Sequence, residues 1–238
     1  MPLQVEHRGR VALLTLDDPG KRNALGVEMV EQIVSAVHAA EADEAIGALV
    51  VTGVAPAFCS GADRSNLDQL HVDQGGNPAE VRSIYDGFLS IRECPLPTVA
   101  AVNGHAVGAG FNLAMCCDAI LAGESARFAP GFTKIGIHPG GGHTWMLERA
   151  LGPHTAAAIA LFGETLDGAR AAEIGLAWRC VADDALLDEA VAMADRVAQL
   201  PRDLAIAIKQ SLREMPWQPN FESAVQTELT RQQKSFGG

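Results

Sequence analysis

Apolar residues along the chain follow two spacings, one typical of strands and the other of helices. Short runs of β-branched and apolar residues predict buried strands at 11–16, 48–52, 98–102 and 119–122. Valines recur at helical spacing from Val27 to about Ala42, with Glu28 and Glu31 in the first turn, and a second helix is predicted from about 79 to 92. Because strands and helices alternate, we expect an α/β fold with right-handed crossovers.

The last third of the chain has a different pattern, which is mainly helical. One strand is predicted at 177–181, and two helical faces are traced by apolar positions between 186 and 197 and between 204 and 215. We therefore predict a core domain over residues 1–185 and a helical C-terminal segment over residues 186–238. The stretch from 57 to 77 is rich in small and polar residues and predicts a long loop.

Composition and charge limit the classes of partner. The chain has 238 residues, of which 48% are hydrophobic, enough for one sizeable core. Its formal charge of −11 disfavours nucleic acid and anionic membranes as partners. The N-terminus lacks the apolar region of a secretory signal, and no run of 18 apolar residues occurs. These features predict a soluble, cytoplasmic protein that binds no membrane.

The 5 cysteines are odd in number and include no C-x-x-C pair. This pattern favours buried free thiols in a reducing compartment over a disulfide framework or a zinc site. We expect no metal ion and no separate cofactor.

Two stations of small residues directly follow predicted strands. One is the segment 58–63, with sequence FCSGAD, and the other is Gly108-Ala109-Gly110, which opens an apolar helix. Small residues allow a ligand to approach the backbone, and a helix N-terminus offers unpaired N–H groups. Two converging N–H groups would form an oxyanion hole. The alternative is that these glycines only pack helix against strand; neither a dinucleotide fingerprint, a P-loop nor a serine-hydrolase elbow fits.

Four motifs occur in the order found in one family. They are GKRNAL at 20–25, AFCSGAD at 57–63, AVNGHAVGAG at 101–110 and IHPGGG at 137–142. On these motifs the chain resembles the crotonase (enoyl-CoA hydratase/isomerase) superfamily over nearly its whole length. The resemblance implies an α/β spiral of ββα units with a helical C-terminal portion that forms homotrimers or dimers of trimers. It also implies an acyl-CoA thioester as ligand, so that coenzyme A is part of the substrate.

The resemblance also implies roles for individual residues. The amides of Ala62 and Ala109 would form the oxyanion hole. The residues implied to contact the substrate or its CoA portion are Arg22, Ala24, Leu25, Ser60, Gly61, Ala62, Asp63, Arg64, Gly108, Phe132 and His138. Lys21 is a further candidate for the CoA phosphates, and Asp118 at the helix end is interpreted as structural.

The departures from the family pattern concern its two catalytic glutamates. Their positions fall at Asn112 and Phe132, and a third acidic position of a dehalogenase-like member falls at Gly140. An asparagine amide orients water but does not take its proton at neutral pH, and phenylalanine does neither. His143 or His138 could replace the missing base; each could instead only fill space. Three aspartate or histidine residues of the long loop, Asp68, His71 and Asp73, are either substitutes or solvated charges.

Three functions remain open on the sequence. The first is an enoyl-CoA hydratase-like lyase or isomerase that acts on an acyl-CoA of fatty acid metabolism. The second is a non-catalytic fatty acyl-CoA carrier that keeps the oxyanion hole to grip the thioester. The third is a structural subunit of a mixed oligomer. Turnover of an enoyl-CoA would separate the first from the other two.

Overall fold

The computed structural model describes residues 1–63 and 78–236, with side chains for all of these except 78–83. The strands are β1 (Leu3–Arg8), β2 (Val11–Leu16), β3 (Ala48–Gly53), β4 (Ala57–Cys59), β5 (Thr98–Val102), β6 (His105–Val107), β7 (Ala119–Gly123), β8 (Arg127–Ala129), β9 (Leu166–Asp167) and β10 (Arg179–Val181). The α-helices are α1 (Val27–Ala42), α3 (Pro78–Glu93), α4 (Ala109–Cys116), α5 (His143–Ala160), α6 (Gly168–Glu173), α7 (Leu186–Ala198), α8 (Arg202–Glu214) and α9 (Phe221–Ser235). Short 3₁₀ helices are η1 (Pro19–Lys21), η4 (Thr133–Ile135) and η5 (Met215–Trp217).

The strands form two mixed sheets that the chain visits in turn. The larger has the order β1-β2-β3-β5-β7-β10 and is parallel except for β1, and the smaller has the order β4-β6-β8-β9 and is parallel except for β9. β3, β5 and β7 lie in the first sheet, and β4, β6 and β8, which follow each of them, lie in the second. The result is a spiral of ββα units, as the resemblance to the crotonase superfamily implied.

Helices cover both faces of the larger sheet because successive strand residues point to opposite sides. On β2, Leu14 and Leu16 join the main hydrophobic cluster with residues of α1, α3 and α4. Val11 and Leu13 join a second cluster with one face of α7. The runs of apolar residues in β2 and β3 therefore reflect burial on both faces, as in a parallel sheet.

Asn23 ties the turn before α1 to the start of β4. It is fully buried, and its Nδ2 donates to the carbonyl oxygens of Val54 at 2.9 Å and Ala57 at 2.7 Å. Its Oδ1 accepts from the amide of Asp18 at 2.9 Å. A side chain with every polar atom satisfied can hold two loops at a set distance, and this one brings residues 22–25 beside β4.

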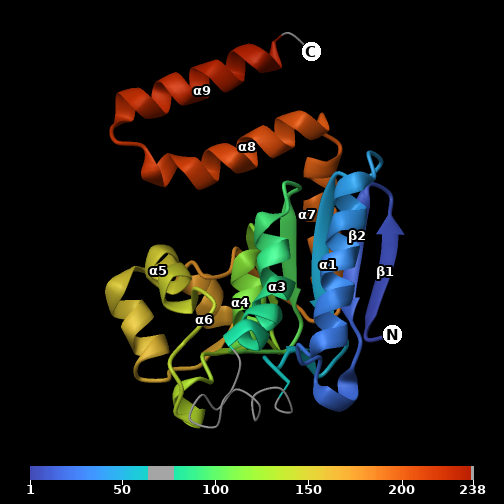
Figure 1. Ribbon diagram of the computed structural model, residues 1–238, viewed down its shortest axis with the longest axis vertical. Helices are drawn as coiled ribbons and strands as arrows, with labels where there is room; N and C mark the ends of the chain where they lie inside the picture. Colours follow the sequence, from blue (N-terminus) through green and yellow to red (C-terminus); the bar gives the residue numbers. More distant parts are fainter. Residues whose placement is uncertain (64–77, 237–238) are drawn as a thin grey trace.

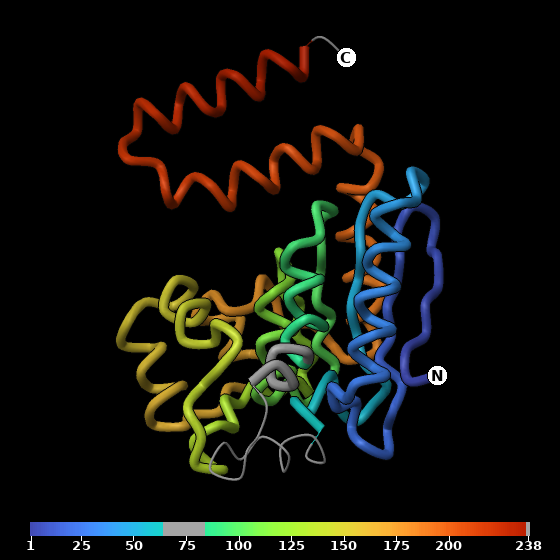
Figure 2. Tube along the Cα trace, viewed as in Figure 1, coloured from blue at the N-terminus to red at the C-terminus, as the bar shows by residue number. Residues whose placement is uncertain are grey.

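The two C-terminal helices stand apart from the layered body. Figure 1 shows α8 and α9 as a helical hairpin that extends beyond the sheets, and Figure 2 traces the same separation. α8 buries Ala205 and Lys209, whereas α9 has no buried residue within the described chain. The Nζ of Lys209 donates to the Leu96 carbonyl oxygen and lies 2.6 Å from Asp118 Oδ2. This ion pair, between the buried Lys209 and the more exposed Asp118, anchors α8 to the body, which supports a structural role for Asp118.

The predicted strands at 11–16, 48–52, 98–102 and 119–122 and the two predicted helices are confirmed. One prediction needs correction. The stretch 57–77, predicted as one loop, begins with the fully buried strand β4. The predicted boundary at 185 coincides with the start of α7, but α7 packs on the sheet, and a separate C-terminal segment stays a prediction.

Candidate functional site

The first station is an extended segment beside Leu25. The amide of Leu25 donates to the carbonyl oxygen of Gly61 at 2.7 Å, and the amide of Asp63 donates to the carbonyl oxygen of Leu25 at 3.0 Å. Successive backbone groups of an extended chain point to opposite sides, so the N–H of Ala62 between them points away from Leu25. Leu25, fully buried, thus aims the Ala62 amide by pairing with both of its neighbours.

The second station is the first turn of α4. Gly108 precedes the helix with φ +55°, a conformation that glycine adopts without strain, and its own N–H donates to the carbonyl oxygen of Ala129 at 3.0 Å. Ala109 is the first helical residue, so its N–H has no acceptor within the helix. The helix dipole adds partial positive charge at this end.

The two stations touch. A Cβ on Gly61 would lie 2.8 Å from the carbonyl oxygen of Val107 and 3.7 Å from the amide nitrogen of Ala109. A Cβ on Gly110 would overlap the carbonyl group of Cys59. Over residues 1–63 and 78–236, neither the Ala62 amide nor the Ala109 amide donates a hydrogen bond. The glycines therefore serve close packing, and the same packing leaves two neighbouring amides available to a ligand.

Asn112, one turn into α4, links the helix to the loop before α5. Its Nδ2 donates to the carbonyl oxygen of Gly140 at 2.9 Å, and its Oδ1 lies 2.8 Å from Nδ1 of His143. A carbonyl oxygen only accepts, so the Nδ2 end of Asn112 must face Gly140 and Oδ1 must accept from His143. Nδ1 of His143 therefore carries the proton, and Nε2 carries the lone pair.

His143 lies in apolar surroundings. It is 1% exposed, and its Nε2 has no hydrogen-bond partner among the described residues. The rings of Phe111 and Phe132 contact the imidazole edge to face, with centroids 5.3 and 5.0 Å away. Burial lowers the pKa of His143 from 6.5 to about 4, so the ring is neutral at neutral pH. Such a ring can accept a hydrogen bond or a proton through Nε2.

Phe132 follows β8 and forms a wall beside the second station. Its ring lies within 4.0 Å of the place that a Cβ on Gly108 would take, and it is half-buried. The Phe132 side chain is apolar, so it keeps water from the face of the His143 ring and offers no proton donor or acceptor.

His138, the other candidate base, is not part of this cluster. It is exposed, and its Nδ1 lies 2.7 Å from the carbonyl oxygen of Pro139. No hydrogen bond joins it to Asn112 or His143 in the described chain.

The candidate CoA residues from 22 to 25 lie against the first station. Arg22 is exposed, with φ +53°, and its carbonyl oxygen accepts from the amide of Ser60 at 3.0 Å. The Ser60 hydroxyl donates to the carbonyl oxygen of Lys21 at 3.0 Å, and Lys21 Nζ lies 2.7 Å from Asp63 Oδ2. Lys21 is therefore paired with a carboxylate in this state. Ala24 is buried; Arg64 and the loop residues Asp68, His71 and Asp73 lie outside the described residues.

Cys59, which lies within the first station, is fully buried. Burial raises the pKa of its thiol to about 12, so it stays protonated at neutral pH and is no nucleophile. Four of the five cysteines are buried and all are free thiols.

Sequence reasoning missed the contribution of α3. A Cβ on Gly140 would collide with the hydroxyl of Tyr85, and one on Gly141 would lie 2.5 Å from Cζ of Phe88 and 2.8 Å from Nδ2 of Asn112. Tyr85 and Phe88 therefore face the loop that Asn112 also contacts. The spacing of the two aromatic residues on a helix was visible in the sequence, but nothing local showed which loop they face.

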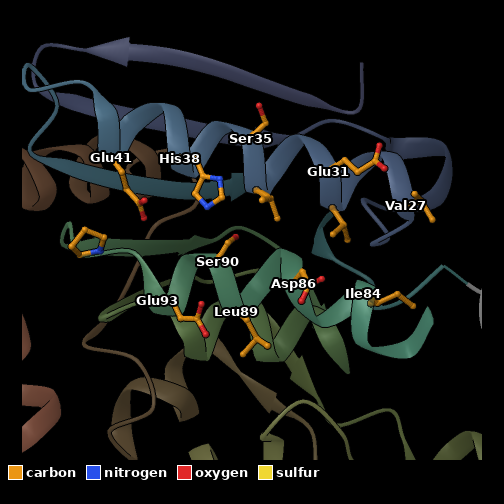
Figure 3. A pocket seen from close by; sticks show the side chains of 13 residues that line it. Val27, Glu31, Ser35, His38, Glu41, Ile84, Asp86, Leu89, Ser90 and Glu93 are labelled. Carbon is orange, nitrogen blue, oxygen red and sulfur yellow. The ribbon is translucent and has the colours of Figure 1, made fainter. Parts of the chain in front are cut away.

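A groove lies on the other face of α3, toward α1. Figure 3 shows side chains of α1 and α3 facing each other across a groove of about 960 Å³. Glu31 and Glu41 of α1 and Asp86 and Glu93 of α3 line it, and none of its described lining residues is a lysine or arginine. Four carboxylates would repel the phosphates of CoA, so this groove is not a candidate for the CoA site.

Two negative findings concern the described part of the chain only. No helix there is both long and apolar enough to cross a bilayer. No three histidine, cysteine or acidic side chains there come together in a group that could hold a metal ion.

Two mixed sheets in a spiral of ββα units, followed by C-terminal helices, define the class of fold. The sequence matches the enoyl-CoA hydratase/isomerase family over residues 6–237. The chain belongs to this family, the crotonase family.

Relatives and solved structures agree with this assignment. "Probable enoyl-CoA hydratase echA14" of Mycobacterium tuberculosis is 48% identical over 205 residues, which cover 85% of this chain and 78% of that protein. A "Probable enoyl-CoA hydratase" of Rhodobacter capsulatus is 38% identical over 227 residues, or 92% and 86% of the two chains. An enoyl-CoA hydratase of Polaromonas sp. JS666 superposes with a TM-score of 0.90 at 29% identity over 98% of this chain and 90% of that one. A Thermobifida fusca YX protein, given as a candidate enoyl-CoA hydratase and solved in complex with CoA, has a TM-score of 0.87 at 30% identity over 99% and 93%.

Proposed function

We propose that this protein acts on an acyl-CoA thioester as a hydratase-like lyase or isomerase. The thioester carbonyl oxygen accepts hydrogen bonds from the amides of Ala62 and Ala109. The observation that carries the proposal is the pair of neighbouring backbone amides, each without an acceptor in the described chain. The relatives named probable enoyl-CoA hydratases and the CoA complex of a similar protein support the choice of ligand.

Two hydrogen-bond donors at the thioester carbonyl oxygen activate C2 and C3 of the acyl group. Negative charge that develops on the oxygen is stabilised by the two N–H groups and by the dipole of α4. This stabilisation makes C3 of an enoyl thioester more electrophilic and the C2 protons of a saturated one more acidic. Removal of one such donor typically costs about 10²–10³-fold in turnover.

The proton transfer falls to residues other than glutamate. At the positions that the resemblance assigns to the two glutamates stand Asn112 and Phe132. The candidate base is His143, because its Nδ1–H is held by Asn112 and its Nε2 carries the lone pair. Nε2 is covered in this state, so the ring of Phe132 must turn aside before a substrate atom reaches it. We expect slow turnover for this reason.

Substrate turnover and binding test the proposal together. The purified protein is incubated with crotonyl-CoA and with a long-chain enoyl-CoA while the conjugated absorbance is followed, and binding of butyryl-CoA and of free CoA is measured by calorimetry. We expect slow loss of absorbance and tighter binding of the acyl thioester than of CoA. Equal affinity for the thioester and for free CoA would contradict the proposed role of the oxyanion hole in binding the thioester.

One observation favours a second candidate, a non-catalytic acyl-CoA carrier. Each polar atom of the Asn112 amide already forms one hydrogen bond within the protein, to Gly140 and to His143, and the side chain is 1% exposed, so the amide is poorly placed to orient a water. Phe132 adds an apolar wall. Binding of acyl-CoA without turnover of any enoyl-CoA would decide for the carrier.

The C-terminal hairpin supports self-association as a further part of the proposal. Trp217, Phe221, Val225 and Leu229 of η5 and α9 are exposed, which is unusual for a run of large apolar residues on one helix. A homotrimer or a dimer of trimers would cover them. Light scattering after size-exclusion chromatography measures the assembly, and a monomer at micromolar concentration would contradict it.

A further inference from the structure

Tyr85 places a hydroxyl group next to the candidate site. It is the one tyrosine of the chain and lies half-buried on α3. Its ring packs on Phe88 with centroids 5.4 Å apart at 42°. Its neighbours Asp86 and Leu89 line the groove toward α1 (Figure 3), whereas Tyr85 faces the loop at Gly140. One helix thus serves the acidic groove with one face and the candidate site with another.

The hydroxyl of Tyr85 has no hydrogen-bond partner in the described chain, although it stands over the backbone of Gly140. The carbonyl oxygen of Gly140 is already held by Nδ2 of Asn112 at 2.9 Å. A phenolic O–H usually has a hydrogen-bond partner when it is buried, and Tyr85 is half-buried. An unpaired O–H at the edge of a ligand site is therefore available to a ligand.

The position of Tyr85 along the site follows from its contacts. Ala109 opens α4, Asn112 lies one turn further along it, and the Asn112 amide binds Gly140, on which Tyr85 rests. One helical turn measures about 5.4 Å. An acyl group that runs along this line from the Ala109 amide past Asn112 reaches the hydroxyl with atoms beyond C3.

We infer that Tyr85 is a specificity-determining residue, whose hydroxyl donates a hydrogen bond to an oxygen that the acyl group carries beyond C3. The inference rests on the proposed function, because it takes the Ala62 and Ala109 amides as the binding site of the thioester carbonyl oxygen. The substrate class is then an acyl-CoA with a keto or hydroxyl oxygen on C4 or further along the chain. A single neutral hydrogen bond of this kind changes affinity by about tenfold.

Three matched ligand pairs test the inference, each pair differing in one keto oxygen. The pairs are butyryl-CoA with 3-oxobutyryl-CoA, pentanoyl-CoA with 4-oxopentanoyl-CoA, and hexanoyl-CoA with 5-oxohexanoyl-CoA. Their Kd values are measured by calorimetry for the wild-type protein, for Tyr85→Phe and for the control Ser90→Ala. Tyr85→Phe removes the oxygen alone and keeps the ring on Phe88. Ser90→Ala removes a hydroxyl of the same helix whose partner is the carbonyl oxygen of Gly87, on the groove side.

The wild-type protein and Ser90→Ala are expected to prefer the 4-oxo or the 5-oxo ligand about tenfold over its saturated partner. Tyr85→Phe is expected to bind both members of that pair equally, with unchanged affinity for the saturated one. A preference for the 3-oxo ligand alone, or one that survives in Tyr85→Phe, overturns the inference and leaves the proposed function standing. Absence of binding for all six ligands overturns both.

Discussion

Nδ1 of His143 donates to Oδ1 of Asn112 across 2.8 Å, and this buried pair joins the first turn of α5 to the first turn of α4. The pair determines which nitrogen of the imidazole carries the proton. Burial makes the protonation of His143 costly, since a second proton would bring a charge into an apolar site. The same two side chains therefore control the stability of the fold and the chemistry available to a ligand.

The stability of the protein should fall between pH 6.5 and pH 4 because of His143. Its pKa is lowered from 6.5 to about 4 in the folded state, so the unfolded chain binds a proton in this window that the folded chain does not. The free energy of unfolding thus rises with pH through the window and loses about 3 kcal/mol on acidification to pH 4. Urea unfolding at several pH values, for wild type and for His143→Gln, measures the difference. If both proteins lose stability with the same slope, His143 is not the group responsible.

Removing only the carboxylate of the Lys209–Asp118 ion pair should cost more folding stability than removing the buried ammonium. Lys209 is 5% exposed, and burial lowers its pKa, which Asp118 partly offsets. Asp118→Ala leaves a buried ammonium with only the carbonyl oxygen of Leu96, and we expect a loss of about 3–5 kcal/mol in the free energy of unfolding.

Lys209→Met removes the charge and keeps an unbranched side chain that is one atom shorter, so we expect it to cost less. Asp118 keeps hydrogen bonds from the amide and the hydroxyl of Thr98 in that variant. A double-mutant cycle by urea unfolding gives the coupling energy. Additive losses in the double variant would show that the two side chains act independently.

Replacement of Ala109 by proline should remove one donor of the oxyanion hole and keep the helix. Proline is tolerated at the first position of a helix, because the N–H there has no partner within it. Any turnover of crotonyl-CoA should fall by about 10²–10³-fold, and the preference for acyl-CoA over CoA should shrink.

Val27→Pro is the matched control, since Val27 is the exposed first residue of α1. It should leave binding and turnover unchanged. Circular dichroism checks that both variants stay helical. An Ala109→Pro variant that is folded and binds acyl-CoA as the wild type does would refute the role of the Ala109 amide.

Carboxylates at the two substituted positions should raise hydration of crotonyl-CoA. We expect the double variant Asn112→Glu, Phe132→Glu to be at least about tenfold faster than wild type, because each general acid or base typically contributes about 10²–10⁴-fold. It should be less stable, since Gly140 loses the donor of Asn112. Asn112→Gln with Phe132→Gln is the control of similar size without ionisable groups. A folded glutamate variant that is no faster than this control would place the family's glutamates elsewhere.

Much of the layered body could be predicted from local pattern. Apolar residues recur at strand or helix spacing in β2, β3, β5, β7, α1 and α3. The reason is that the buried positions of a strand or a helix face repeat along the chain with the period of its backbone. β4, β6 and β8 were missed. Each has three residues, too few for a period to show, and each becomes a strand only by pairing in the smaller sheet.

Part of the candidate site could likewise be predicted from the sequence, and part could not. The sequence by itself determined that small residues follow two strands, at Gly61 and Gly108. The two backbone segments approach each other so closely that larger side chains are excluded. Only the tertiary structure decided that Lys21 pairs with Asp63, that His143 protonates at Nδ1, and that Tyr85 faces Gly140. These contacts join residues far apart in the chain. Their partners are chosen by how the layers pack, which no local pattern of residues contains.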